Sequence, residues 1–255
     1  MNVLAVPLKG RRRQKKWNVT ESIIFVILVL VTGFVLLSSP VFEVRRVLVR
    51  GNYYLSEEMI LSVADVGLGV NIFKLKMADV SSNLKQVPMI KEAQVARSLP
   101  SSVVISVVER VPLGLLPSKE GFIEVDEEGV YLARAGAGTP GLPVITGVQV
   151  DITGPGQVIG SEKLKSALDV IKGLPAGSAA NLSEVHVDED GQIKIYTTEG
   201  YQCRFGLPQE IQEKGEIFQQ VLLELRKQGA KINYIDLSYA GQPVVYYKSL
   251  TKAGD

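Results

Sequence analysis

The sequence predicts an α+β protein that a single transmembrane helix anchors to a membrane. Three observations carry this prediction: one long apolar run, a mixture of strand and helix periodicities after it, and hairpin turns between the later strands. The chain has 255 residues, enough for two small outer domains beyond the run. We expect a cytoplasmic basic tail over 1–19, the transmembrane helix over 20–39, a first outer domain over 40–111, a second over 112–248 and a C-terminal tail over 249–255.

The apolar run extends from Thr20 to Leu37 and has no charge after Glu21. At about 1.5 Å per residue, some 18–20 helical residues cross the roughly 30 Å hydrocarbon core of a bilayer. A helix that is apolar on all sides belongs in lipid rather than in water. The alternatives are a buried core helix and a cleaved signal peptide. The run is longer than a typical signal-peptide core, and LLSSPVFEV has no Ala-x-Ala cleavage site.

The residues before the run predict its orientation. They are strongly basic, contain no acidic residue and end in an aromatic that fits an interfacial anchor: Lys9, Arg11, Arg12, Arg13, Lys15, Lys16 and Trp17. By the positive-inside rule this end stays in the cytoplasm, which leaves everything after Pro40 extracytoplasmic. A basic run can also bind nucleic acid, and that is the alternative interpretation.

The composition of the outer part excludes some functions. Beyond Pro40 the chain has 22 basic and 26 acidic residues, which is not the charge of a nucleic-acid surface. Cys203 is the only cysteine, so no intrachain disulfide forms and each outer domain must be held by its apolar core.

The first outer domain is predicted to run strand, helix, helix, strand, strand. Val41–Arg50 is β-prone, with a shift of phase at Arg45–Arg46 that suggests a bulge. Ser56 fits a helix N-cap, and that helix should stop near Gly67. Its apolar stripe is Met59, Ile60 and Val63.

A short link that buries Phe73 should lead into a second helix over Lys76–Gln86. Two strands, Ile90–Arg97 and Ser102–Arg110, then form a hairpin around a Leu-Pro-Ser turn. Two helices would therefore cover one face of a three-stranded sheet.

The second outer domain is predicted to be a mainly antiparallel sheet with two helices. Phe122–Asp126 and Val130–Ala133 flank a hairpin turn in which Gly129 can take positive φ. Further strands are expected at 183–188, 193–197, 201–205, 232–237 and 243–248, with helices at 161–174 and 209–228. The stretch between Ala135 and Gly160 is rich in Gly and Pro and is interpreted as a loop.

Catalytic chemistry is not predicted. His186 is the only histidine, and it alternates with valines in a strand, so a catalytic triad or a zinc site would lack companions. Cys203 fits a buried structural thiol better than a nucleophile. The acidic clusters at 126–128 and 188–190 lack the spacing of a calcium loop and are interpreted as solvated turns. We therefore predict no enzyme, no cofactor and no metal.

Four strings carry a resemblance to a known family, three in the first outer domain and one in the second. FEVRRVLVRGNYYLSEEMI, GVNIFKL and VPMIKEAQVARSLPSSVVISVVERVP resemble the POTRA domain of the FtsQ/DivIB family of bacterial cell-division proteins, with its Gly-Asn turn, Asn-x-Phe link and final Glu-Arg-x-Pro. INYIDLSYAGQPVVYYK resembles the end of the family's β domain. The family often has Arg after Asp-Leu, where this chain has Ser238, so we expect no salt bridge from this position.

The resemblance implies a divisome scaffold at the septum of the cell membrane. Such a protein binds the small bitopic FtsB/DivIC-like protein that pairs with an FtsL-like protein, contacts other divisome components, and helps to control septal peptidoglycan synthesis. The matching positions point to Tyr239 as a contact, with Leu237 beside it. An unpaired terminal strand also invites pairing with a partner strand, which adds Val244, Val245, Tyr246 and Tyr247. The alternatives are a POTRA-type assembly or secretion module and a membrane-anchored hydrolase.

Overall fold

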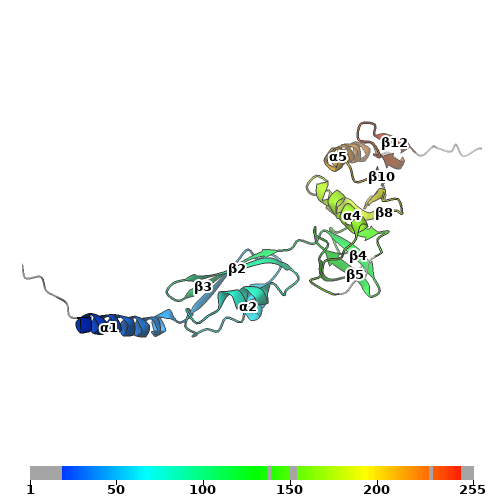
Figure 1. Ribbon diagram of the computed structural model, residues 1–255. Coiled ribbons are helices and arrows are strands. Elements are labelled where there is room, and N and C mark those ends of the chain that lie inside the picture. Colours follow the sequence, from blue (N-terminus) through cyan, green and yellow to red (C-terminus); the bar gives the residue numbers. More distant parts are fainter. Residues whose placement is uncertain (1–18, 137–138, 150–153, 230–231, 248–255) are drawn as a thin grey trace, which may run out of the picture.

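The computed structural model describes residues 19–136, 139–149, 154–229 and 232–247. An N-terminal helix leads into a small three-stranded unit, and a larger unit built on a nine-stranded sheet follows (Figure 1). We call these the proximal unit (β1–β3, α2 and α3) and the distal unit (β4–β12, α4 and α5). Each has a separate apolar core. The α+β class is confirmed, whereas the exact domain bounds stay a prediction.

Helix α1 (Val19–Leu37) coincides with the predicted span. It is long and apolar enough to cross a membrane, and none of it is buried against the rest of the described chain. Its 19 residues correspond to a length of about 28 Å. A 3-10 turn, η1 (Pro40–Phe42), follows, with Ser39 as its N-cap. Val41 and Phe42 therefore belong to this turn, and their prediction as part of a strand is wrong.

The sheet of the proximal unit has the order β1-β3-β2. Strand β1 runs parallel to β3, and β2 runs antiparallel to it, so the predicted hairpin is confirmed. Both helices cover one face, where they pack on residues such as Val103, Ile105 and Val107 of β3. The bounds are β1 (Arg46–Arg50), α2 (Glu57–Ala64), α3 (Met77–Leu84), β2 (Ile90–Ser98) and β3 (Ser102–Glu109).

Two apolar residues of the proximal unit lie elsewhere than predicted. Phe73 was expected in the core but is 42% exposed, and Ile72 is buried in its place. Met59 on α2 is also exposed, whereas Ile60 is buried. In both pairs neighbouring residues compete for one inward position, and hydrophobicity alone does not decide which of the two is buried.

A carboxylate fastens the loop between β1 and α2. Glu109, the last residue of β3, accepts hydrogen bonds of 3.0, 2.7 and 3.0 Å from the backbone N–H groups of Tyr53, Tyr54 and Leu55. The preceding turn requires glycine, because Gly51 has φ +84° and a Cβ there would lie 2.2 Å from the Val107 carbonyl oxygen. Sequence reasoning found the turn but not the carboxylate that holds it.

The distal sheet has the order β12-β11-β10-β9-β8-β7-β4-β5-β6. The predicted antiparallel meander β8-β9-β10 is confirmed, while β7 pairs parallel with both β4 and β8, and β11 pairs parallel with β10. Helices α4 (Glu162–Gly173) and α5 (Ile211–Gln228) pack on its core face. The strands are β4 (Gly114–Ser118), β5 (Gly121–Val125), β6 (Tyr131–Ala135), β7 (Val144–Thr146), β8 (Leu182–Val187), β9 (Ile193–Thr197), β10 (Gln202–Gly206), β11 (Ile232–Asp236) and β12 (Val244–Tyr247), with a 3-10 turn η2 (Ala179–Asn181).

Charged groups join the two units. Arg110 Nη1 lies 2.5 Å from Asp126 Oδ2 and 2.7 Å from Glu128 Oε2, and Lys91 Nζ lies 3.1 Å from Glu127 and 2.9 Å from Glu128. Hydrogen bonds from Arg110 and then Lys91 lower the pKa of Glu128 to about 2. The prediction of a solvated turn is wrong for Asp126, which is buried, because the proximal unit supplies its cation.

The distal core contains one lysine that the sequence did not reveal. Lys214 on α5 is almost fully buried, and its ammonium donates to the carbonyl oxygens of Phe205 and Leu207 at 3.1 and 3.2 Å. Loss of hydration lowers its pKa. Cys203 is fully buried in the same core, as predicted, and burial raises the pKa of its thiol.

Candidate partner-binding edge

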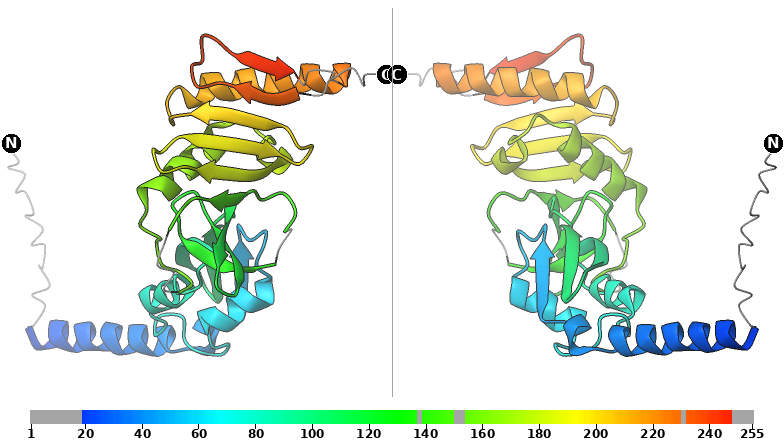
Figure 2. Two further views of the ribbon diagram at one scale, coloured as in Figure 1. Left: turned by 90° about the vertical axis from the view of Figure 1, so that its right-hand side faces the viewer. Right: turned by 90° about the vertical axis from the view of Figure 1, so that its left-hand side faces the viewer.

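Strand β12 forms one border of the distal sheet. It pairs antiparallel with β11 in the register Tyr234↔Tyr246, Ile235↔Val245 and Asp236↔Val244. No other described residue pairs with its outer side. Figure 2 shows β12, in red, at the end of the molecule farthest from α1, in blue. A row of backbone N–H and C=O groups is therefore presented far from the membrane helix.

The four sheet edges of the described chain differ in their protection. Strand β1 begins and ends with arginine, and β2 carries Lys91, Glu92 and Arg97. The β6 edge is partly covered, because Tyr131 exchanges backbone hydrogen bonds with the segment 156–157. Strand β12 has the sequence VVYY, without a charge or a proline. Charge and coverage are the usual protections of a sheet edge, and β12 has neither within the described residues.

Next to this edge, stacked side chains lie on the face of the sheet that the helices do not cover. The rings of Tyr234 and Tyr246 stack with centroids 4.3 Å apart and an interplanar angle of 25°. The guanidinium of Arg204 lies 3.9 Å from the centroid of the Tyr234 ring. Loss of hydration, followed by a hydrogen bond with Tyr246, raises the pKa of Tyr234. We call these three residues, one each from β10, β11 and β12, the aromatic ladder.

The predicted contact residues separate into an exposed and a buried set. Tyr239, in the turn between β11 and β12, is 78% exposed, and Val244, Tyr246 and Tyr247 are exposed on the edge strand. Val245 is half-buried and packs on the core. Leu237 is fully buried, so its prediction as a direct side-chain contact is wrong. Its position at the end of β11 turns it inward, where it supports the strand.

Ser238 stands where the family often has arginine, and its contacts are with the neighbouring residues Asp236 and Gly206. Its backbone N–H donates to Asp236 Oδ1 at 3.0 Å. Its Cα would lie 2.9 Å from a Cβ at Gly206, the last residue of β10. The chain after β11 is therefore held close to β10, and this fixes the start of the turn that presents Tyr239.

Sequence reasoning missed Arg204 and Tyr234 in the aromatic ladder. A signal was present, since each alternates with a core residue on its strand: Arg204 lies between Cys203 and Phe205. Alternation shows that such a residue faces away from the core, but only the strand order shows that β10 and β11 lie in sequence beside β12 at this border of the sheet. The predicted topology residues Arg11, Arg12, Arg13, Lys15, Lys16 and Trp17 lie outside the described residues.

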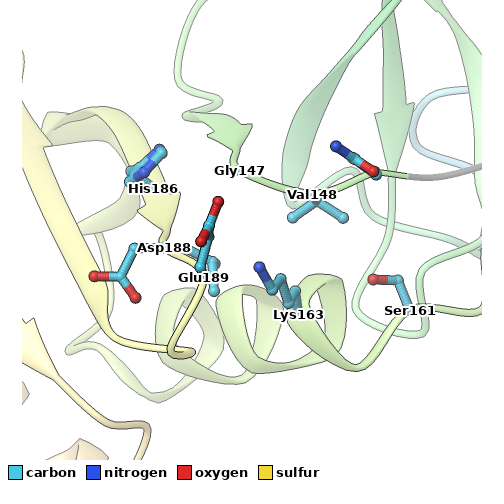
Figure 3. A pocket seen from close by; sticks show the side chains of 9 residues that line it. Gly147, Val148, Ser161, Lys163, His186, Asp188 and Glu189 are labelled. Carbon is cyan, nitrogen blue, oxygen red and sulfur yellow. The ribbon is translucent and has the colours of Figure 1, made fainter.

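A polar pocket of about 700 Å³ lies elsewhere in the distal unit, between the end of β7, the start of α4 and the turn after β8. Figure 3 shows Lys163 on one side of it and His186, Asp188 and Glu189 on the other. Because its lining carries charges of both signs, it favours neither anions nor cations.

The histidine beside this pocket does not form a catalytic triad. Thr146 Oγ1 lies 2.5 Å from Glu184 Oε1 and 2.7 Å from His186 Nδ1. In a triad, the carboxylate and the hydroxyl contact different nitrogens of the imidazole ring. Here both approach Nδ1, with Glu184 at 4.0 Å. His186 therefore lies against two polar neighbours, Thr146 and Glu184, on the face of the sheet opposite the core valines.

Comparison with known proteins finds relatives along both units. The profile of the POTRA domain, FtsQ-type, matches residues 42–110, and that of the cell division protein FtsQ/DivIB, C-terminal, matches residues 114–238. The chain is 28% identical over 222 residues to the cell division protein FtsQ of Syntrophotalea carbinolica, covering 84% of this chain and 77% of the relative. It is 28% identical over 216 residues to the cell division protein DivIB of Clostridium tetani, covering 82% and 81%. The second profile ends one residue before Tyr239.

Proposed function

The chain belongs to the FtsQ/DivIB family of cell division proteins, and from this membership we propose that it is a membrane-anchored, non-enzymatic scaffold of the division machinery. It binds an FtsB/DivIC-like protein, paired with an FtsL-like protein, outside the membrane. Binding at the septum holds this pair in place and helps to control septum formation and septal peptidoglycan synthesis.

The observation that supports this proposal is the open edge of β12. A partner segment in extended conformation adds there as a further strand, with backbone hydrogen bonds supplying affinity. Exposed Val244 and the aromatic ladder, which lies on the same side of the sheet, supply contacts for alternate partner side chains. Tyr239 extends the surface beyond the strand end. Stacked tyrosines lose little side-chain entropy on binding, which suits them to an interface.

The position of the edge fits a partner that also spans the membrane. Strand β12 lies at the end of the molecule opposite α1 (Figure 2). A bitopic partner must extend a segment well away from the bilayer to reach it. With the basic tail in the cytoplasm, the chain presents β12 on the extracytoplasmic side, where the outer segment of such a partner would meet it.

Binding of variants tests the proposal. Full-length protein in nanodiscs is titrated with the purified extracytoplasmic segments of the partner pair. Tyr239→Ala and Val244→Lys should each weaken binding at least about tenfold, which corresponds to about 1.4 kcal/mol. The lysine adds the charge that protected edges carry. Tyr53→Ala is the matched control, because Tyr53 is 90% exposed on the proximal unit.

Three outcomes would contradict the proposal: no binding by folded wild-type protein at tens of micromolar, equal loss in the Tyr53 control, or unchanged affinity in both β12-edge variants. Circular dichroism of each variant must show an unchanged melting transition, because a destabilised variant would lose binding for another reason. A fluorescent fusion tests localisation separately, and a uniform envelope signal during constriction would contradict a septal role.

A further inference from the structure

Five exposed apolar side chains gather at the end of the proximal unit that receives α1. They are contributed by η1, the loop between α2 and α3, and the turn between β2 and β3. We call them the membrane-proximal patch: Val41, Leu68, Val70, Phe73 and Leu99. Leu68 and Leu99 are 69% and 59% exposed. Single exposed apolar residues are normal on a protein surface, whereas a cluster marks a contact.

Hydrogen bonds hold the α2–α3 loop against the exit of α1. Asn71 Nδ2 donates to the carbonyl oxygen of Leu37, the last residue of α1, at 2.7 Å. The backbone N–H of Ile72 donates to Phe42 O at 2.8 Å, and that of Val44 donates to Val70 O at 2.9 Å. The patch residues on this loop are therefore within a few residues of atoms that contact the end of the span.

The β2–β3 turn reaches the same end of the unit. The carbonyl oxygen of Ser101, two residues after Leu99, accepts from the backbone N–H of Arg45 at 2.8 Å. Arg45 in turn follows the segment that leaves α1. Figure 1 shows this end of the proximal unit next to α1, and the distal unit at the opposite end.

The length of α1 sets the depth of the patch. Its span of about 28 Å nearly equals the roughly 30 Å hydrocarbon core, so Leu37 lies close to the hydrocarbon boundary. The headgroup region extends some 5–8 Å beyond that boundary on each side. Groups in contact with Leu37 and their immediate neighbours therefore lie within the headgroup region.

The exposure of Phe73, which was predicted to lie in the core, fits a position in the headgroup region. Its ring contacts Phe42, with centroids 5.2 Å apart, and is otherwise directed outward. Exposed Lys74 follows Phe73 in the sequence. Exposed Arg45 donates from its guanidinium to the carbonyl oxygen of Pro40, next to Val41, at 3.5 Å. Apolar side chains rimmed by basic ones suit the boundary between acyl chains and anionic headgroups.

We propose that the membrane-proximal patch is seated in the headgroup region of the bilayer that α1 crosses, as a second contact with lipid. The apolar side chains reach the acyl boundary, and the two basic side chains lie among the lipid phosphates. This second lipid contact restrains the tilt of the proximal unit about the end of α1. It requires that α1 spans the membrane, but it holds for either orientation and does not depend on the partner of β12.

Depth-sensitive fluorescence quenching tests this contact between the membrane-proximal patch and lipid in the full-length protein. In a Cys203→Ala background, Leu68→Cys and Leu99→Cys are labelled with an environment-sensitive dye and reconstituted in phosphatidylcholine nanodiscs. Tyr53→Cys is the matched control, since it is exposed on the same unit in the loop fastened to the last residue of β3. Lipids with a nitroxide near the headgroup should quench both patch sites several-fold more than the control.

Equal quenching at all three sites would overturn the proposal. In a second experiment the nanodiscs also contain the anionic lipid phosphatidylglycerol, which should increase quenching at the patch sites. Quenching that is unchanged by this lipid would overturn the role of Arg45 and Lys74 but retain the apolar contact. All three positions are exposed, so labelling should leave the fold intact, and an unchanged melting transition checks this.

Discussion

Replacing Arg110 by methionine should destabilise the distal unit and loosen its junction with the proximal unit. Arg110 is 16% exposed, and it pairs with the 2% exposed side chain of Asp126 as well as with the half-exposed Glu128. Methionine keeps much of the apolar stem but removes the charge. Asp126 then stays buried with one oxygen, Oδ2, deprived of its cation.

The magnitude follows from what remains around Asp126. Breaking a buried ion pair costs about 3–5 kcal/mol. Asp126 Oδ1 keeps two backbone donors, from Glu128 at 2.9 Å and Val130 at 2.8 Å, which places the cost at the low end. The pair with Glu128 adds less than about 1 kcal/mol because that carboxylate is half-exposed. We expect a total loss of about 3 kcal/mol in the free energy of unfolding.

Urea unfolding of the full-length protein in detergent, followed by circular dichroism, measures this loss. Lys172→Met is the matched control, because Lys172 pairs with Glu127 of the same turn at 2.5 Å but is 61% exposed. The control should cost at most about 1 kcal/mol. If Arg110→Met costs no more than the control, the burial of Asp126 is not what makes this junction stable, and the reasoning fails.

Three further predictions concern single side chains. Glu109→Gln should cost about 2 kcal/mol of proximal-unit stability, because an amide keeps one acceptor for three backbone donors; a loss below about 0.5 kcal/mol by urea unfolding would be contrary evidence. Lys214→Met should cost about 2 kcal/mol, because the buried carbonyl of Phe205 and the part-buried carbonyl of Leu207 lose their donor; an equal or higher melting temperature would refute this. The pKa of Glu128 lies at about 2 in the folded protein, below its ordinary 4.5, so the unfolded state binds more protons between these values. The stabilisation is complete above about pH 5 and is lost as pH falls toward 2. Wild type should therefore lose more stability between pH 5 and pH 3 than Glu128→Gln, and equal losses would contradict the assignment.

The parts of the fold that sequence reasoning predicted are those with strong periodic patterns. Helix α1 follows from an unbroken apolar run, the helix at Ser56 from its N-cap and apolar stripe, and the central strand β3 from apolar alternation. Strand β4 was missed because its five residues, GLLPS, contain glycine and proline and have no alternation. It is paired on both sides by β5 and β7, so tertiary pairing overrides local propensity there.

The candidate site was only partly predictable for a related reason. β-Propensity identified VVYY as a strand, but its position at the border of the sheet depends on which strands pair, and these are distant in sequence. Leu237 and Asp126 show the opposite error. The family resemblance made Leu237 a contact and polarity made Asp126 a surface residue, yet three-dimensional packing buries both. Burial of a polar group requires a partner, and Arg110 is 16 positions away from Asp126.

Hydrogen–deuterium exchange of full-length protein in nanodiscs, with and without the partner pair's extracytoplasmic segments, tests the central claim most directly. An added strand must hydrogen-bond to backbone groups of β12, so peptides covering Val244–Tyr247 should exchange more slowly in the complex, while peptides from β1 and β2 keep their rates. Saturated binding that leaves exchange at β12 unchanged would contradict the claim that this open edge receives the partner.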